Sequence, residues 1–319
     1  MKRLIGILLL LSMLSGCAGT EYGAAQSADF TIGVVVKGMD SPHWLDVRSG
    51  LSDAARENNV NVLVLYPAKE DEADEQAHMF RDLVARAPDA ILFAPCDSEN
   101  CGELIDLAAS ADIPLITIDT AANEGNLPYV GADNLTIGRM AATRLAGQAK
   151  QSGKLAVIAG VETQSSHADR VEGFRLTAEG YPDVTVAGVY RADSDFQRAM
   201  DCMEQIMREH PDVEGVFCTS AVMALGAAEQ LRAGGYTNKP RIVGVDTQDD
   251  ALAALRTGVL DGLVTQDGYE CGYKAVGYAV SMLRGESIAD RVYIDTTLQT
   301  QGTVDELIEA RAARKGGQT

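Results

Sequence analysis

The sequence is poor in basic residues: 27 lysines and arginines stand against 46 acidic residues in a chain of 319, and the formal net charge at pH 7 is −19. A surface of this sign repels phosphate backbones, so we expect no nucleic acid among the partners. No apolar run after residue 14 is long enough to span a bilayer. We therefore expect the body of the protein to lie in water.

The sequence also lacks the short motifs of several enzyme classes. It contains no Gly-x-Ser-x-Gly, no His-Glu-x-x-His and no glycine-rich phosphate loop. Gly33, Gly38 and Gly50 do not have the spacing of a dinucleotide-binding fingerprint. We expect a protein that is not an enzyme and that uses no cofactor.

Cysteines are few, and apart from Cys17 their number is odd, so at least one is unpaired. They are Cys96, Cys101, Cys202, Cys218 and Cys271. Cys96 and Cys101 flank a turn-like segment and could form a disulfide in an oxidising compartment, which the sequence alone leaves open. No histidine spacing and no second close cysteine pair supports a metal site, so none is expected.

The N-terminus has the pattern of an export signal. Lys2 and Arg3 precede an apolar span, residues 4–14, that is short for a permanent membrane helix. The following Leu-Ser-Gly-Cys, residues 14–17, resembles the lipobox of bacterial lipoproteins, which implies removal of residues 1–16 and lipidation of Cys17. An ordinary secretory signal with an incidental cysteine is the alternative. Residues 17–29 are small and polar, and we expect a tether.

A repeated strand–helix–strand pattern organises the rest of the chain. The apolar, β-branched runs 31–36 and 60–65 flank a helix-like segment, residues 42–58, and a second copy begins at residue 155. Such runs are typical of parallel strands covered on both faces. We expect an α/β protein with two doubly wound, Rossmann-like parallel-sheet lobes, with the site at loops that follow the strands.

The same alternation predicts the remaining elements. The expected strands are 90–94, 113–118, 129–130, 184–189, 215–218, 241–245, 262–265 and 292–294. One expected helix begins near residue 70. The others span 99–109, 136–150, 195–210, 221–233, 249–257 and 270–283.

Five motifs in fixed order carry a resemblance to a known family. They are Asp-Ser-Pro-His-Trp at 40–44, Ile-Thr-Ile-Asp at 116–119, Arg-Val-Glu-Gly-Phe at 170–174, Met-Ala-Leu-Gly-Ala at 223–227 and Ile-Val-Gly-Val-Asp at 242–246. The sequence resembles the type I periplasmic binding proteins of the ribose-binding kind, which serve ATP-binding-cassette (ABC) sugar importers. The resemblance implies an N-terminal lobe (30–132 plus 267–294), a C-terminal lobe (133–266 plus 295–312), three crossings between them and a tail, 313–319.

The resemblance also implies polar ligand groups. Asp119 and Asp246, each just past a strand, match family carboxylates that accept hydrogen bonds from sugar hydroxyls, and Gln266 matches a polar residue beside a hinge. Carboxylates suit this role because they form charge-assisted bonds with hydroxyl donors. Helix N-caps are the alternative for both aspartates. Arg170 matches an arginine that braces its loop, and we weigh bracing above ligand contact.

Aromatic groups complete the implied site. Trp44 and His43 fall where the family places rings against a sugar face, and Phe196 falls where the opposite lobe supplies its own ring. Trp44 could instead be helix core, and His43 could lie at the rim.

Several positions depart from the ribose-binding pattern. Ala168 and Thr120 stand where arginines are expected, and Ser41 stands where an asparagine is expected. Ser220 and Ala221 stand where an asparagine followed by an aspartate is expected. We therefore expect a ligand other than ribose, such as another sugar, a polyol or a furanosyl autoinducer, with Ser41, Thr120 and Ser220 at the site. Further polar side chains on the same loops could serve this ligand: Gln164, Ser165, Ser166 and His167. Because the site has few bases, an anionic ligand is disfavoured.

The expected function is capture of a small neutral ligand by hinge closure, in a monomer on the extracytoplasmic side of the membrane, for delivery to an ABC permease. The alternative is a sensory subunit that presents the same closed form to a receptor kinase. An extracytoplasmic enzyme is a third and weaker reading.

Overall fold

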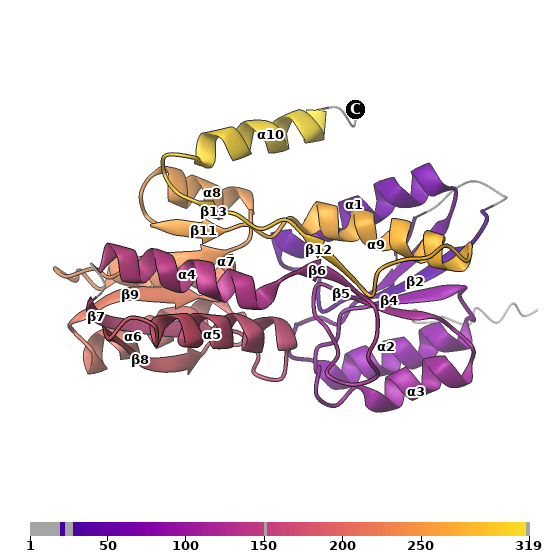
Figure 1. Ribbon diagram of the computed structural model, residues 1–319, viewed down its shortest axis with the longest axis horizontal. Helices are drawn as coiled ribbons and strands as arrows, with labels where there is room; N and C mark the ends of the chain where they lie inside the picture. Colours follow the sequence, from indigo (N-terminus) through magenta and orange to yellow (C-terminus); the bar gives the residue numbers. More distant parts are fainter. Residues whose placement is uncertain (1–19, 23–27, 150–151, 317–319) are drawn as a thin grey trace, which may run out of the picture.

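The computed structural model describes residues 20–22, 28–149 and 152–316, so the export signal and lipobox expected at 1–17 lie outside the described residues. The chain forms two α/β lobes side by side (Figure 1). The first sheet has the order β1 (Thr20–Tyr22), β3 (Asn61–Leu65), β2 (Thr31–Val35), β4 (Ala90–Phe93), β5 (Leu115–Ile118), β6 (Tyr129–Ala132) and β12 (Arg291–Ile294). The second has the order β13 (Leu298–Gln299), β11 (Gly262–Val264), β10 (Arg241–Val245), β9 (Val213–Cys218), β7 (Ser152–Ala159) and β8 (Asp183–Arg191).

Both sheets are parallel except at one edge. Only β1, which pairs with β3, and β13, which pairs with β11, run antiparallel to their neighbours among the described strands. The parallel pairing confirms the predicted fold class.

Helices cover both faces of each sheet. The first carries α1 (Pro42–Asn58) and α9 (Gly268–Leu283) on one face and α2 (Ala73–Ala85) and α3 (Gly102–Ser110) on the other. The second carries α4 (Asn134–Gln148) and α5 (Ser165–Ala178) opposite α6 (Phe196–Glu209), α7 (Ala221–Ala233) and α8 (Asp249–Arg256). Successive residues of β2 enter different cores, Val34 that of α1 and α9 and Val35 that of α2 and α3. This double burial explains an apolar run without polar alternation.

The chain passes between the lobes three times. It leaves the first lobe between β6 and α4, returns between β11 and α9, and leaves again between β12 and β13. These crossings bring the carboxyl ends of strands from both sheets toward one another.

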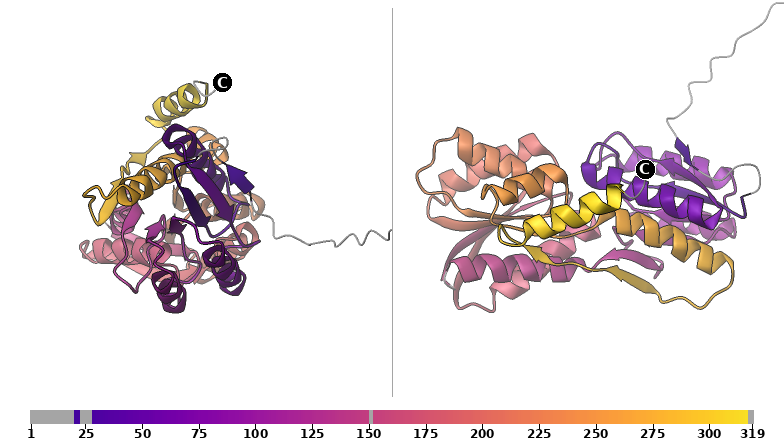
Figure 2. Two further views of the ribbon diagram at one scale, coloured as in Figure 1. Left: turned by 90° about the vertical axis from the view of Figure 1, so that its right-hand side faces the viewer. Right: turned by 90° about the horizontal axis from the view of Figure 1, so that it is seen from above.

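Three elements were not predicted. Thr20–Tyr22, within the expected tether, forms β1 on the edge of the first sheet, so the tether prediction is wrong for these residues. The short β13 and the helix α10 (Val304–Gly316) follow the last crossing. Helix α10 lies across the junction of the lobes (Figure 2), where Arg311 pairs with Asp46 of α1 at 2.7 Å and Arg314 pairs with Asp267 at 2.8 Å.

The five cysteines in the described part of the chain are free and buried. The disulfide that the sequence left open is absent: Cys96 Sγ lies 4.0 Å from the carbonyl oxygen of Lys37, and Cys101 Sγ lies 3.7 Å from that of Ser98. Within the described ranges, no helix has the length and apolarity needed to cross a membrane, and no group of three or more metal-binding side chains is found.

Helices α1 and α9 pack closely at glycines, which gives a test of the fold. A Cβ atom on Gly272 would lie 2.1 Å from the carbonyl oxygen of Val47, and one on Gly50 would lie 2.0 Å from that of Tyr269. We expect Gly272→Ala to push the helices apart and to lower the free energy of unfolding by about 1–3 kcal/mol. Gly277 is the control in the same helix, because a Cβ there meets nothing within 4 Å. Gly277→Ala should be neutral or stabilising in urea unfolding, and equal stability of both variants would contradict the prediction.

Candidate functional site

A pocket between the lobes gathers most of the expected site residues. It is lined by Lys37, Ser41, His43, Trp44, Glu70, Asp119, Ser166, His167, Arg170, Ser194, Ser220, Val222, Asp246 and Gln266. These residues come from loops that follow strands and from the first two turns of helices in both lobes. All of the expected residues line the pocket except Thr120 and Phe196.

Asp119 is the hub of the pocket. It follows β5 in a left-handed backbone conformation, with φ of 61°, and is 3% exposed. Its Oδ2 accepts hydrogen bonds from His43 Nε2 at 2.9 Å and from Gln266 Nε2 at 2.5 Å, and its Oδ1 accepts one from the Thr120 hydroxyl at 3.0 Å. Burial alone would raise its pKa, but the hydrogen bond from His43 and the charges of His43 and Lys37 hold the pKa well below its usual value. Asp119 is therefore an ionised acceptor at neutral pH.

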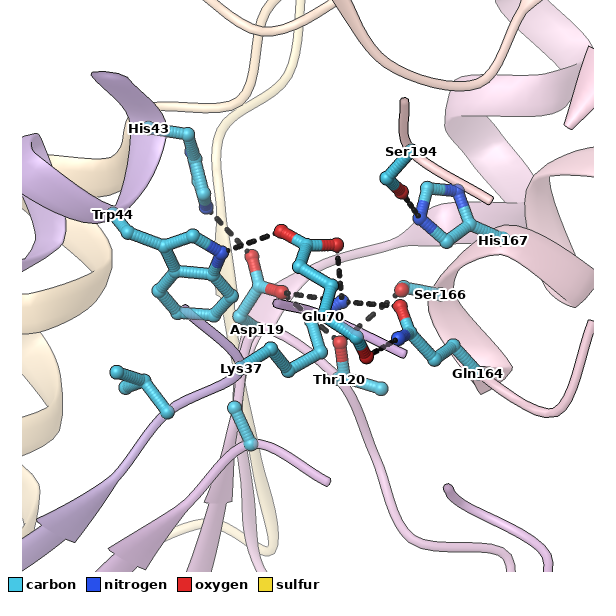
Figure 3. A network of polar contacts seen from close by, with 12 residues as sticks. Lys37, His43, Trp44, Glu70, Asp119, Thr120, Gln164, Ser166, His167 and Ser194 are labelled. Carbon is cyan, nitrogen blue, oxygen red and sulfur yellow. Dashed lines mark hydrogen bonds and ion pairs between the residues drawn. The ribbon is translucent and has the colours of Figure 1, made fainter. Parts of the chain in front are cut away.

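His43 lies between acids of the two lobes, and Figure 3 shows its contact with the first of them, Asp119. Its Nε2 contacts Asp119, and its Nδ1 lies 3.9 Å from Oδ1 of Asp246. Burial favours the neutral ring, but the hydrogen bond to Asp119 and the negative charges of Asp119 and Asp246 outweigh it and raise the pKa of His43 to about 9. The imidazolium links the lobes electrostatically at neutral pH.

Asp246 has a second attachment within its own lobe. Its Oδ2 accepts the backbone N–H of Ala221 at 3.3 Å, at the first residue of α7, whose N-cap is Ser220. The N-cap of the helix that follows Asp246 is Gln248. Neither Asp119 nor Asp246 is thus the N-cap of a helix in the structure. The other oxygen of Asp246, Oδ1, lies on the side of His43 in the pocket.

Lys37 is a pocket residue that the sequence analysis missed. It is 3% exposed, and its Nζ donates to Oε1 of Gln164 in the other lobe at 2.7 Å (Figure 3). Glu70 and Asp119 each lie 3.9 Å from Nζ, and Glu70 also accepts the indole N–H of Trp44 at 2.7 Å. The position of Lys37, directly after the apolar run of β2, is the sequence signal that could have identified this residue.

Arg170 connects three parts of the pocket. It is 4% exposed and donates to Oδ1 of Asn134 at 2.9 Å, to the carbonyl oxygen of Thr219 at 2.7 Å and to Oε1 of Gln266 at 2.5 Å. This guanidinium links the start of α4, the loop after β9 and the second crossing. These hydrogen bonds suit a structural brace, and Arg170 also lines the pocket.

Two expected site residues lie elsewhere. Thr120 is fully buried behind Asp119, and its Oγ1 lies 3.1 Å from the Ser166 hydroxyl of the other lobe. Phe196 is 42% exposed and lines a separate cavity with Leu225 and Val259, so its expected place in the cleft is wrong. The reason is local: Asp195 caps α6 by accepting the N–H of Arg198, the helix begins at Phe196, and the residue that reaches the pocket is Ser194.

The pocket also holds more basic groups than the sequence indicated. Lys37, Arg170 and protonated His43 supply three positive groups opposite Asp119, Asp246 and Glu70. Sequence reasoning missed Lys37, Glu70, Ser194 and Val222, whose contribution depends on how the loops fold over the strand ends. Trp44 combines both of its predicted roles, because it is 1% exposed in the core of the first lobe and still lines the pocket.

Comparisons with known proteins agree with this architecture. A family model described as "Periplasmic binding protein domain" matches residues 32–287. The ribose import binding protein of Bacillus subtilis (strain 168) is 27% identical over 310 residues, which cover 94% of this chain and 100% of that protein. The structure is similar to a carbohydrate transporter solute binding protein from Agrobacterium radiobacter in complex with D-arabinose, with a TM-score of 0.84, 28% identity and coverage of 89% and 99%. It is also similar to a chain of the XylFII–LytSN complex, with a TM-score of 0.80, 25% identity and coverage of 86% and 99%. The family and the first two of these relatives are described as binding proteins, which confirms the prediction that this chain is not an enzyme.

Proposed function

Because this chain belongs to the periplasmic binding protein family, with the type I arrangement of two lobes, we propose that it captures a small neutral sugar or polyol and delivers it to an ABC permease. The observation that carries the proposal is the pair of buried carboxylates, Asp119 and Asp246, brought from different lobes to one pocket. The names of the similar proteins, which include ribose import and D-arabinose-bound transporter components, support a sugar as the ligand class.

The balance of charge supports an uncharged ligand. Three acids and three cationic groups already offset one another, so a ligand with net charge would leave one buried charge without a counterpart. Oδ1 of Asp246 and Oε2 of Glu70 have their nearest cations at 3.9 Å, beyond hydrogen-bond distance, and are free to accept ligand hydroxyls. The Lys37 ammonium has three donors and one short hydrogen bond, so it can donate to ligand oxygens.

Hinge closure is the proposed mechanism. In the structure the lobes touch across the cleft through Lys37 and Gln164, and through the Ser165 hydroxyl, which donates to the carbonyl oxygen of Ala121 at 2.7 Å. A ligand that contacts both lobes adds bonds only in this closed form, so it shifts an open ensemble toward it by that difference in affinity. The closed outline is then the signal that a permease recognises.

The proposed setting is the extracytoplasmic face of the membrane. The lipobox-like residues 14–17 support removal of residues 1–16 and attachment through a lipid on Cys17. We propose that the protein acts as a monomer, and its charge of −19 argues against nucleic acid as a partner.

A sensory role is the second candidate. The similarity to a chain of the XylFII–LytSN complex supports it, because that relative is found bound to another protein. Deletion of the gene separates the two roles. Loss of ligand uptake supports delivery to a permease, whereas intact uptake with loss of a ligand-induced response supports sensing.

Thermal unfolding of the purified protein with D-ribose, D-arabinose, D-allose and xylitol tests the proposed function. A ligand at a hundred times its Kd stabilises the folded form by about 2.7 kcal/mol, so at least one of these compounds should raise the melting temperature. The anion D-gluconate is the control and should have no effect. A shift with gluconate and with none of the neutral compounds would reject a neutral sugar site.

A further inference from the structure

Three side chains, Thr219, His167 and Ser194, form a hydrogen-bonded chain along one wall of the pocket. The chain ends at the ligand space, and Figure 3 shows two of its members, His167 and Ser194. Thr219, directly after β9, lies with its Oγ1 2.8 Å from Nδ1 of His167 in the first turn of α5. Nε2 of the same ring lies 3.2 Å from Oγ of Ser194, which lines the pocket from the loop between β8 and α6. Of its three members, the sequence pointed only to His167, as a polar residue on a loop of the site.

The local structure is built around the imidazole ring. A Cβ atom on Gly160 would come within 2.4 Å of Nε2 of His167, so the glycine leaves the space that the ring occupies. Asp193 and Ser194 both have left-handed backbone conformations, with φ of 47° and 60°. Two such residues in succession are unfavourable outside a structure that holds them. The contact of Asp193 Oδ2 with Arg198 at 2.5 Å holds this turn, which presents Ser194 to His167 and to the pocket.

The direction of the hydrogen bonds follows from Thr219. This residue is fully buried, and its Oγ1 accepts the N–H of Gly160 at 3.0 Å. Within the described ranges its other hydrogen-bond neighbour is Nδ1 of His167, so its hydroxyl proton points to that nitrogen. The opposite direction would leave a buried hydroxyl donor unpaired, at a cost of about 1–3 kcal/mol.

The protonation state of His167 then determines the hydrogen-bond role of Ser194. Burial, together with the positive charges of Lys37 and Arg170, holds the pKa of His167 well below its usual value, so the ring is neutral. A neutral imidazole that accepts at Nδ1 carries its proton on Nε2, and this N–H donates to Oγ of Ser194. The hydroxyl proton of Ser194 is left to point into the pocket.

We propose that Ser194 is a specificity-determining residue that acts as an obligatory donor, so that the ligand must place an acceptor oxygen against this wall of the cleft. Thr219 and His167 are positioning residues that fix this role. The inference rests on the proposed function and narrows it: the acids accept from ligand hydroxyls, whereas Ser194 requires a ligand oxygen with a free lone pair. A ligand with hydrogen in place of that oxygen would leave the donor unpaired.

Calorimetric titration with D-ribose, D-arabinose, D-allose and xylitol tests the contact. Ser194→Ala should bind about tenfold more weakly than the wild type to every one of these compounds that the wild type binds, the loss typical of one hydrogen bond. Ser49→Ala is the matched control, since Ser49 is exposed on α1 and its hydroxyl donates to the carbonyl oxygen of Leu45 in the same helix. It should bind as the wild type does.

Wild-type affinity of Ser194→Ala would overturn the inference alone, whereas a wild type that binds none of the four compounds would overturn the proposed function and the inference with it.

The tautomer of His167 tests the direction without any ligand. Nitrogen-15 NMR of the ligand-free protein should show the neutral ring with its proton on Nε2. Thr219→Ser keeps the hydroxyl and should keep this tautomer, whereas Thr219→Val removes the donor to Nδ1 and should shift the ring toward the Nδ1–H form. A wild-type ring protonated on Nδ1 would overturn the assigned direction, whatever the affinities are.

Discussion

Replacement of Asp119 with asparagine should weaken ligand binding at least a hundredfold. Asp119 holds an ionised carboxylate among His43, Gln266, Thr120 and Lys37, and hydrogen bonds to a charged group are worth about 1.5–3 kcal/mol each. The substitution turns one acceptor oxygen into a donor that faces the donors of its neighbours. In the proposed site this carboxylate also accepts hydrogen bonds from ligand hydroxyls, and loss of two such charged bonds corresponds to roughly a hundredfold or more in Kd. Calorimetric titration with the compound that raises the melting temperature most measures the effect.

A second variant separates binding from folding. Asp119→Asn also removes the negative charge that pairs with His43 and Lys37, so its melting temperature should fall. Asp246→Asn should lose binding to a similar extent with a smaller loss of stability, because Asp246 has one hydrogen bond from a backbone N–H and a longer contact with His43. If both variants are folded and bind like the wild type, the ligand does not occupy this pocket.

The fold was predictable because strands buried on both faces leave a clear pattern. Residues 31–35 and 241–245 are short apolar runs, each followed by a helical segment, and both became inner strands of parallel sheets. Helix α1 matched its prediction at both ends, because Ser41 caps it and Pro42 occupies its first turn. The acids Asp119 and Asp246 stand out for the same reason, as polar residues directly after buried strands.

Side chains whose direction depends on one loop were not predictable. Glu70 lies in an acidic run, and the sequence does not say which of these acids turns toward Trp44. Phe196 and Ser194 differ by two positions, yet the cap at Asp195 sends one to an outer cavity and the other to the cleft. Only the backbone conformation after β8 decides between them.

Several contacts across the closed cleft are polar, and this has a consequence for ligand release. His43, Lys37 and α10 each connect the lobes through charged groups, and such contacts exchange readily with water when the cleft opens. An apolar interface of the same extent would favour the closed form without ligand. Polar contacts therefore leave more of the closing free energy to the ligand itself.

The pH dependence of stability should report the protonation of His43. Its pKa in the folded protein is about 9, above the value of 6.5 for an unperturbed histidine. The folded form therefore binds this proton more tightly than the unfolded chain does. The resulting stability is fully present below about pH 6.5 and is lost as the pH rises through 9. A shift of this size corresponds to roughly 3 kcal/mol.

His43→Gln isolates this effect, because glutamine can donate a hydrogen bond to Asp119 and does not titrate. We expect the wild type to lose several degrees of melting temperature between pH 6.5 and 9.5, and the variant to lose much less. His167 acts in the opposite direction, because its pKa in the folded protein is held well below its usual value while the unfolded histidine takes up a proton near pH 6.5. This opposing contribution is small above about pH 7.5 and is the same in both proteins. Asp119 acts at the acidic end of the pH scale. Its lowered pKa in the folded protein adds to the free energy of unfolding, and this contribution disappears only as the pH falls below about 4. Both proteins should therefore lose stability in acid, whereas parallel curves from pH 6.5 to 9.5 would show that His43 is not charged between the two aspartates.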